Sequence, residues 1–352
     1  MPIRILGSGA FVPENIVKNE DFINDTFLDE QGIPYPFDNA EIVKKFKSIT
    51  GIEQRRYADH HILTSDMAFL ASQKAIEDAG IDPETLDYVI VAHNFGNVKN
   101  AAIQTDILPS LASRVKHDLK IKNPKCVAYD LIFGCPGWLE GVIHAQAFIK
   151  CGMAKRCLIV GAEALSRVVD PYDRDKMIYS DGAGATVIGF SDEQGGIGGH
   201  ASLSFTYDEA YYLHFGASYN KEEHPDVRYI KMDGRKIYEF ALSQVPEAMF
   251  ACVEAAGIPI ERIKKVLIHQ ANEKMDEAII QRFYKKYKTT PPEGIMPMSI
   301  HELGNSSVAT IPTLYDRLMK NELTGHQVQK GDYLLFASVG AGMNINAMLY
   351  EV

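Results

Sequence analysis

The stretch Asp130-Leu-Ile-Phe-Gly-Cys-Pro-Gly-Trp-Leu-Glu-Gly141 decides how this chain folds. It joins an apolar segment expected to be a short strand, Cys126 to Leu131, to a helical pattern from Trp138 to Lys150. Pro136 suits the first position of that helix, where its missing N–H has no helical partner to lose. Cys135 is therefore expected at a helix N-terminus, where the dipole favours an anion and lowers the pKa of a thiol. The alternative reading is a small buried cysteine at a tight packing point.

Composition limits the classes of protein that the chain can belong to. Its 352 residues are 46% hydrophobic, enough for two domains or one duplicated fold. The net charge of −10, without a basic run, argues against nucleic acid as a partner. No apolar run is long enough to span a bilayer and the first residues lack the core of a signal peptide, so no membrane partner and a cytoplasmic location are expected.

The cysteines indicate reduced thiols and no metal site. There are five of them, an odd number, and no CxxC pair occurs. They stand at positions 126, 135, 151, 157 and 252.

Strands alternate with helices along the chain, which predicts a largely parallel α/β sheet. A helix is expected over Thr64 to Ala79, closed by Gly80. A second is expected over Ala101 to Leu119, interrupted at Pro109. The expected strands cover 3–6, 88–92 and 157–161, and residues 181–190 are expected to be a Gly-rich turn that leads into a further strand.

The second half of the chain repeats the first. Residues 79–91 and 256–268 share Ala-Gly-Ile, a Glu and a Val at a separation of 177. Residues 135–150 and 305–320 both follow a Gly and open an amphipathic helix, at a separation of 170. Ordered matches at nearly one separation favour an internal duplication over chance similarity of βαβ units. We expect halves at 1–195, carrying the cysteine, and 196–352.

The duplication singles out two further residues. His269 stands just beyond its strand where the first half has Ala92, and Asn305 is the counterpart of Cys135. Ligands bind at strand ends in α/β sheets, so these differences between the halves fall where Cys135 is placed. The plainer alternatives are a hydrogen-bonded core histidine for His269 and a helix N-cap for Asn305.

These residues carry a resemblance to a known family. Gly134-Cys135, Val266-Leu-Ile-His-Gln-Ala-Asn272 and Gly304-Asn-Ser-Ser-Val-Ala-Thr-Ile-Pro312 resemble the active-site motifs of β-ketoacyl-acyl-carrier-protein synthase III. The resemblance implies the thiolase fold, in which two βαβαβαββ halves form a five-layer αβαβα sandwich, and a homodimer. Related ketosynthases and thiolases use other sets of catalytic residues, whereas synthase III enzymes and type III polyketide synthases use Cys, His and Asn.

The family's activity is a decarboxylative Claisen condensation between an acyl primer and a malonyl thioester, in fatty-acid initiation or secondary metabolism. The resemblance implies that Cys135 carries the acyl group, that His269 and Asn305 stabilise the enolate, and that the N–H groups of Cys135 and Ala341 form the oxyanion hole. It implies no cofactor and no metal. By position, the resemblance also implies residues that contact the nucleotide, the pantetheine or the acyl chain of the substrate. These are Arg167, Gly234, Asn272 and Leu108.

Several positions depart from the family's pattern. Lys45 stands near the place of a Trp that stacks on the CoA adenine, and Arg235 replaces a neutral pantetheine contact. Loss of this stacking weakens the binding of CoA more than that of acyl carrier protein, so the carrier protein is the expected partner. Lys274 and Lys285 are candidates for docking that acidic partner, the alternative being a solvated helix face. Segments 20–47 and 93–107 are long for the family.

Two other functions remain open at this point. One is a thiolase-fold enzyme that uses the acyl-cysteine for a non-decarboxylating condensation or acyl transfer, as in dialkylresorcinol-type synthases. The other is a non-catalytic partner subunit, against which the intact set of Cys135, His269 and Asn305 counts. The length and type of the primer do not follow from the residues.

Overall fold

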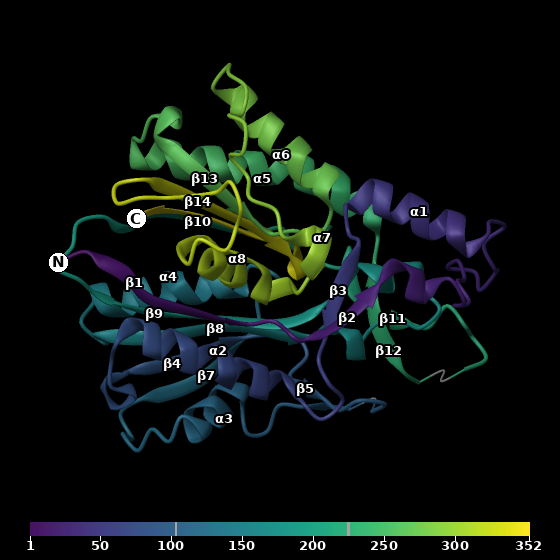
Figure 1. Ribbon diagram of the computed structural model, residues 1–352, viewed down its shortest axis with the longest axis horizontal. Coiled ribbons are helices and arrows are strands. Elements are labelled where there is room, and N and C mark those ends of the chain that lie inside the picture. The colour runs from purple at the N-terminus through teal and green to yellow at the C-terminus, as the bar shows by residue number, and fades with distance from the viewer. Residues whose placement is uncertain (103, 224–225) are drawn as a thin grey trace.

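The computed structural model describes residues 1–102, 104–223 and 226–352 and contains two central sheets (Figure 1). The first sheet has the order β1-β9-β8-β4-β7 and the second β10-β15-β14-β13. The strands of the first sheet are β1 (Ile3–Phe11), β4 (Tyr88–Ala92), β7 (Val127–Leu131), β8 (Arg156–Ala164) and β9 (Asp181–Phe190). Those of the second are β10 (Gly196–Ser204), β13 (Ile263–Ile268), β14 (Tyr333–Gly340) and β15 (Asn344–Glu351).

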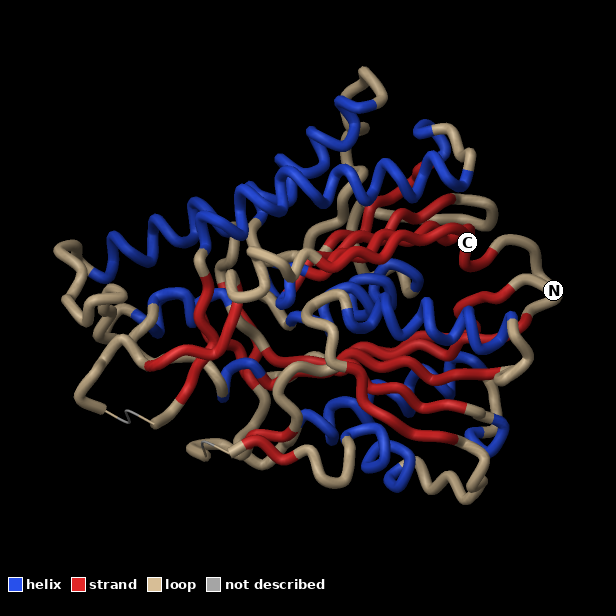
Figure 2. The backbone as a smooth tube through the Cα atoms, turned by 180° about the vertical axis from the view of Figure 1, so that it is seen from behind, coloured by secondary structure: helices blue, strands red, loops and turns tan. Residues whose placement is uncertain are grey.

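Helices and sheets form five layers, as Figures 1 and 2 show. Helices α4 (Gly137–Lys150) and α8 (Thr310–Met319) lie between the two sheets. Helices α2 (Thr64–Ala79) and α3 (Leu111–Asp118) cover the outer face of the first sheet, and α5 (Gly234–Ala256) and α6 (Glu273–Lys286) that of the second. This is the predicted αβαβα sandwich.

The central layer is buried because its helices are apolar around most of their surface. Trp138 of α4 is 1% exposed and its ring lies 5.9 Å from that of Phe336 in β14. Its indole Nε1 donates to Thr186 in β9, on the other sheet. One side chain of the predicted central stretch thus ties the two sheets together.

The strand register confirms the duplication. Tyr88 of β4 pairs with Cys157 of β8, and Lys265 of β13 pairs with Leu334 of β14, each partner displaced by the same 177 residues. On this arrangement we propose 1–195 and 196–352 as the two halves. The second half lacks a counterpart of strand β7 within the described ranges. Its place is taken by residues 294–298, where Val266 N–H donates to Ile295 C=O at 2.8 Å, and Pro297 has no N–H to extend a ladder.

The helix expected over 101–119 is wrong in its first half. Only α3, from Leu111 to Asp118, is helical, and it follows directly on Ser110, whose side chain caps it. Residues 97–98 and 105–106 instead form a small hairpin, β5 (Asn97–Val98) and β6 (Thr105–Asp106). Residue 103 lies outside the described residues. Pro109 therefore precedes the helix. A proline disfavours the helical conformation of the residue before it, so the helix begins only after Pro109.

The remaining elements lie together at one end of the two sheets, on the right of Figure 1. They are β2 (Asn15–Lys18), α1 (Asn39–Thr50), β3 (Gln54–Tyr57), β11 (Leu213–Ala217), β12 (Arg228–Met232) and the short α7 (Ile300–Leu303). The long segment 20–47 thus supplies most of α1. None of the helices within the described ranges has the length and apolarity to cross a membrane.

Candidate active site

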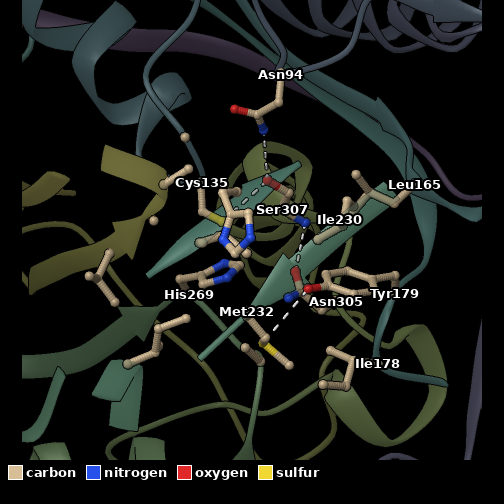
Figure 3. Close-up of a pocket in the computed structure, with 18 of the residues that line it drawn as sticks. Asn94, Cys135, Leu165, Ile178, Tyr179, Ile230, Met232, His269, Asn305 and Ser307 are labelled. Atoms are coloured by element: carbon tan, nitrogen blue, oxygen red, sulfur yellow. Dashed lines mark hydrogen bonds between the residues drawn. The ribbon is translucent and has the colours of Figure 1, made fainter. Parts of the chain in front are cut away.

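A cavity of about 1520 Å³, counted with its open mouth, lies where the two halves meet. Its walls include six of the residues predicted from the sequence: Cys135, Gly234, His269, Asn272, Asn305 and Ala341. Figure 3 shows Cys135, His269, Asn305 and Ser307 projecting into one space, the last two from the same turn. The duplication therefore brings together residues that are far apart in the chain.

The backbone around Cys135 is a tight turn between β7 and α4. Gly134 has φ +68°, a left-handed conformation that glycine adopts without strain. The turn lies against the strand end at Gly340, where a Cβ would fall 2.3 Å from the nitrogen of Cys135. A Cβ on Gly134 would fall 2.7 Å from the nitrogen of Ala341. The N–H groups proposed for an oxyanion hole thus belong to two backbone segments in close approach.

Asn305 occupies the matching turn of the second half. It follows Gly304, which has φ +63°, and precedes the short 3₁₀ turn Ser307–Ala309 that leads into α8. Its side-chain oxygen accepts the N–H of Ser307 at 2.8 Å. The amide oxygen therefore stabilises the turn itself and is not the N-cap of α8, which follows Ala309, while the amide Nδ2 has no partner among the described residues.

His269 lies at the end of β13, where its N–H donates to Ala337 C=O at 2.9 Å. The residue is 5% exposed, and its ring Nδ1 has no partner among the described residues. Burial lowers the pKa of His269 to about 4. The imidazole is therefore neutral at physiological pH, and it carries one N–H donor and one acceptor.

The expectation of a lowered thiol pKa is wrong for the substrate-free site. Burial in the apolar cavity raises the pKa of the Cys135 thiol to about 11, with a smaller opposing effect from the hydrogen bond of Ser307. The neutral ring of His269 supplies no positive charge to counter the desolvation of a thiolate. Cys135 and His269 thus rest as an uncharged pair.

A hydrogen-bonded chain behind Cys135 was not identified from the sequence. Ser307 Oγ donates to Cys135 Sγ at 3.2 Å, and Asn94 Nδ2 donates to Ser307 Oγ at 3.2 Å. Asn94 also donates its N–H and its Nδ2 to Glu163 Oε1, at 2.7 and 2.5 Å. Burial raises the pKa of Glu163 to about 8. Ser307 could have been found, because it lies within the Gly-Asn-Ser-Ser word; nothing in the sequence marks Asn94.

Next to Cys135 the cavity wall is largely apolar. The side chains come from the segments before β9 and from the hairpin β11–β12, and they belong to one buried cluster. Those that line the cavity are Phe95, Leu165, Ile178, Tyr179, Leu213, Ile230 and Met232. Such a wall suits an acyl chain, and the polar atoms of the site gather at one end of it.

Other predicted residues lie away from the cavity wall. The guanidinium of Arg167 donates to the carbonyl oxygens of Val98, Asp59 and Ile62. Leu108 is 87% exposed.

The two candidate docking lysines are both exposed and lie at opposite ends of α6. Lys274 is in the first turn, beside the cavity residues Asn272 and Met275. Lys285 is in the last turn, about 16 Å away at the rise of an α-helix. Within the described ranges no group of three or more His, Cys, Asp or Glu is arranged to hold a metal ion.

Comparisons with known proteins agree with this geometry. Residues 129–204 match the model of 3-oxoacyl-[acyl-carrier-protein (ACP)] synthase III and residues 253–352 that of its C-terminal part. The chain is 32% identical over 349 residues to β-ketoacyl-[acyl-carrier-protein] synthase III 1 of Bacillus cereus, covering 99% of this chain and 98% of the relative.

Solved structures of the family superimpose on nearly the whole chain. The β-ketoacyl-[acyl carrier protein] synthase III of Thermus thermophilus matches with a TM-score of 0.80 and 30% identity over 99% of both chains. The priming β-ketosynthase of the R1128 polyketide pathway matches with a TM-score of 0.82 and 26% identity, covering 100% of this chain and 96% of that one. The chain has the thiolase fold and belongs to the 3-oxoacyl-[acyl-carrier-protein] synthase III family of acyltransferases.

Proposed function

We propose that this protein catalyses decarboxylative condensation of an acyl primer, held on Cys135, with malonyl-acyl-carrier-protein. The observation that carries the proposal is the meeting of a thiol, a neutral imidazole and a free amide N–H₂ group at one end of a largely apolar cavity. An acyl chain fits the apolar wall, and the polar end holds the groups that the chemistry needs.

In the first half-reaction Cys135 attacks the primer's thioester carbon. A bond forms between that carbon and Sγ, the primer's own C–S bond breaks, and the thiol proton leaves with the departing sulfur. Ser307 donates its hydrogen bond to Sγ at 3.2 Å, which favours the developing thiolate. The N–H groups of Cys135 and Ala341 stabilise the tetrahedral oxyanion.

In the second half-reaction the malonyl group loses CO₂. Its C–C bond breaks, and the electron pair passes into an enolate whose charge falls on the thioester oxygen. The neutral N–H of His269 and the Nδ2 of Asn305 donate to that oxygen. The enolate carbon then attacks the acyl group, the bond to Cys135 breaks, and Sγ recovers a proton. The products are a β-ketoacyl thioester and CO₂, with no oxidation or reduction and no requirement for a cofactor or metal.

We propose acyl carrier protein as the carrier of both acyl groups. The carrier's pantetheine enters past Gly234 and Asn272, and Lys274 offers a cation at that entrance. The guanidinium of Arg167 is engaged by carbonyl groups, which disfavours its use for a nucleotide, whereas Arg235 is exposed in a weak pair with Glu239 at 2.9 Å and does not distinguish the two carriers. Lys285, at the far end of α6, is a weaker candidate for the same partner than Lys274.

We further propose a homodimer that works in the cytoplasm. Strand β7 is an edge of its sheet, and Val127 and Ile132 beside that edge are 47% and 61% exposed. An open apolar edge of this kind favours pairing with a second copy, and Leu108 would then lie near the partner's cavity. All five cysteines are unpaired, as in a reducing compartment.

The test combines intact-protein mass with a labelled donor. The protein is incubated with a panel of acyl-carrier-protein thioesters and then with malonyl-carrier protein bearing ¹³C in its free carboxyl. We expect an acyl adduct on Cys135, then loss of the label as ¹³CO₂ and formation of a β-ketoacyl product. Retention of the label, or a product assembled from two acyl chains, would instead support the non-decarboxylating alternative. Cys151→Ser is the control, since Cys151 is exposed and outside the cavity wall.

A further inference from the structure

Tyr179 places a hydroxyl group in the otherwise apolar part of the cavity. The residue is 8% exposed and lines the cavity together with Leu165, Ile178, Ile230 and Met232. Figure 3 shows its ring beside Asn305, with the hydroxyl directed toward Met232. A phenylalanine ring would fill the same space, so packing alone does not account for the oxygen.

The hydroxyl has almost no internal partner. Among the described residues its one hydrogen bond goes to Met232 Sδ at 3.8 Å, and a thioether is a weak acceptor. A buried hydroxyl without a good acceptor is unfavourable by an amount that a ligand recovers when it supplies one. Burial keeps the pKa of Tyr179 well above its usual value, so the phenol stays a neutral donor throughout the working range of pH.

The backbone of Tyr179 is held by the turn that carries Asn305. The N–H of Asn305 donates to Ile178 C=O at 3.0 Å, and the N–H of Ser180 donates to Asn305 C=O at 2.8 Å. Tyr179 lies between these two bonds and pairs with Asn305 in a parallel bridge. The backbone of Tyr179 is therefore fixed relative to that of Asn305, and its buried ring packs in the apolar cluster that contains Ile178 and Ile230.

We propose that Tyr179 selects primers whose acyl chain carries an oxygen, as a hydroxyl or oxo group, within reach of the phenol. The inference rests on the proposed function, because it requires the acyl chain on Cys135 to lie along this wall. A plain alkyl chain leaves the phenol with its thioether partner alone. An oxygenated chain offers an acceptor at the same place, and the preference follows from that difference.

The test measures how fast Cys135 is acylated by octanoyl-pantetheine and by its 3-hydroxy, 3-oxo, 5-hydroxy and 5-oxo analogues, using intact-protein mass. We expect at least one oxygenated analogue to acylate the wild-type protein about tenfold faster than octanoyl-pantetheine, the size of one hydrogen bond. Tyr179→Phe should reduce that ratio to near one. Tyr284→Phe is the matched control, since Tyr284 is 2% exposed with an unpartnered hydroxyl outside the cavity wall, and it should keep the wild-type ratio.

A second variant guards against a folding defect in Tyr179→Phe. Met232→Leu removes the thioether acceptor and leaves the phenol, so the preference for the oxygenated primer should persist or increase. Equal ratios in the wild type and Tyr179→Phe, or loss of the preference in Met232→Leu, would overturn the role of Tyr179 while leaving the proposed reaction intact. Absence of any acylation of wild-type Cys135 would overturn the proposed function itself.

Discussion

The two halves of the molecule are built on one plan and differ where the chemistry is proposed. Each half has a left-handed glycine before a helix of the central layer, Gly134 and Gly304, and the next residue is Cys135 in one and Asn305 in the other. Each also has a parallel strand pair in the same register. At the end of the equivalent strand, 177 residues apart, one half has Ala92 and the other has His269. The duplicated backbone thus supplies two equivalent positions, and the two halves place different side chains at them.

A second pair shows how each strand end is held. The residue after Ala92 is His93, whose Nε2 bonds to Asp130 at 2.9 Å and whose Nδ1 accepts the N–H of Gly96. The residue after His269 is Gln270, which donates to Pro297 C=O at 2.8 Å and accepts the N–H of Ser299 at 2.9 Å. Both brace the strand against its neighbouring segment. Both ring nitrogens of His93 therefore have hydrogen-bond partners within the fold, whereas the ring of His269 lines the cavity and its Nδ1 has none among the described residues.

The largest effect is expected from removing the side chain that only the first half provides. Cys135→Ala should abolish acylation and condensation, with a loss on the order of 10⁶ in turnover, as for loss of a nucleophile in other covalent enzymes. Intact-protein mass and product formation measure it. Cys151→Ser, which removes an exposed thiol, should retain both activities, and residual acylation of Cys135→Ala would place the nucleophile elsewhere.

The next effect comes from making the second half more like the first. His269→Ala introduces the residue found at Ala92 and removes one enolate donor; Asn305→Ala removes the other. Each variant should still be acylated but should release CO₂ from malonyl-carrier protein about 10²–10³ times more slowly. Decarboxylation at the wild-type rate in Asn305→Ala would show that its amide does not contact the enolate.

The uncharged resting pair predicts a pH dependence of thiol alkylation. Since the pKa of Cys135 is raised to about 11, the thiolate fraction and the iodoacetamide rate should increase about tenfold per pH unit, or about a hundredfold from pH 6.5 to 8.5. His269, with a pKa lowered to about 4, should contribute no inflection above pH 5. The measurement is made in Cys151→Ser. A plateau already at pH 7 would restore the lowered pKa expected from the helix N-terminus.

The bracing residues should differ in how much stability they contribute. Gln270→Leu leaves a buried C=O and a buried N–H without partners and should lower the free energy of unfolding by about 1–3 kcal/mol. His93→Leu should cost less, because it leaves only the buried N–H of Gly96 without a partner, while Asp130 keeps the N–H groups of Leu111 and Ala112 as donors. Urea titration compares the two variants. A larger loss of unfolding free energy in His93→Leu than in Gln270→Leu would mean that the first half depends more on His93 than the second half depends on Gln270.

The smallest effect is expected at the entrance, on a helix of the second half. Lys274→Glu should lower kcat/KM for carrier-bound malonyl by about tenfold or less, in a salt-dependent manner, and should change the reaction of malonyl-CoA less. Lys285→Glu is the matched control at the far end of α6, with an expected effect near zero. Equal losses with both donors would remove Lys274 from carrier recognition.

Much of this architecture could be predicted from local patterns. The apolar strands, the end of α2 at Gly80 and the duplication follow from periodicity and from repeated words, and the last two are confirmed by a left-handed cap and by strand register. The helix expected over 101–119 failed in its first half, where the chain forms a hairpin instead. Local periodicity does not reveal a β pairing of only a few residues that competes with the helix.

Local patterns were enough to single out Cys135, His269 and Asn305 as candidates, because each follows a strand or a glycine at a position that the duplication repeats. Their charge states and neighbours depend on the folded chain. A helix N-terminus alone predicts a lowered thiol pKa, but the walls of the cavity come from segments far away in the chain, and burial against them raises the pKa of Cys135 to about 11. For the same reason the roles of Asn94, Ser307 and Tyr179 depend on contacts across the two halves, which no local pattern contains.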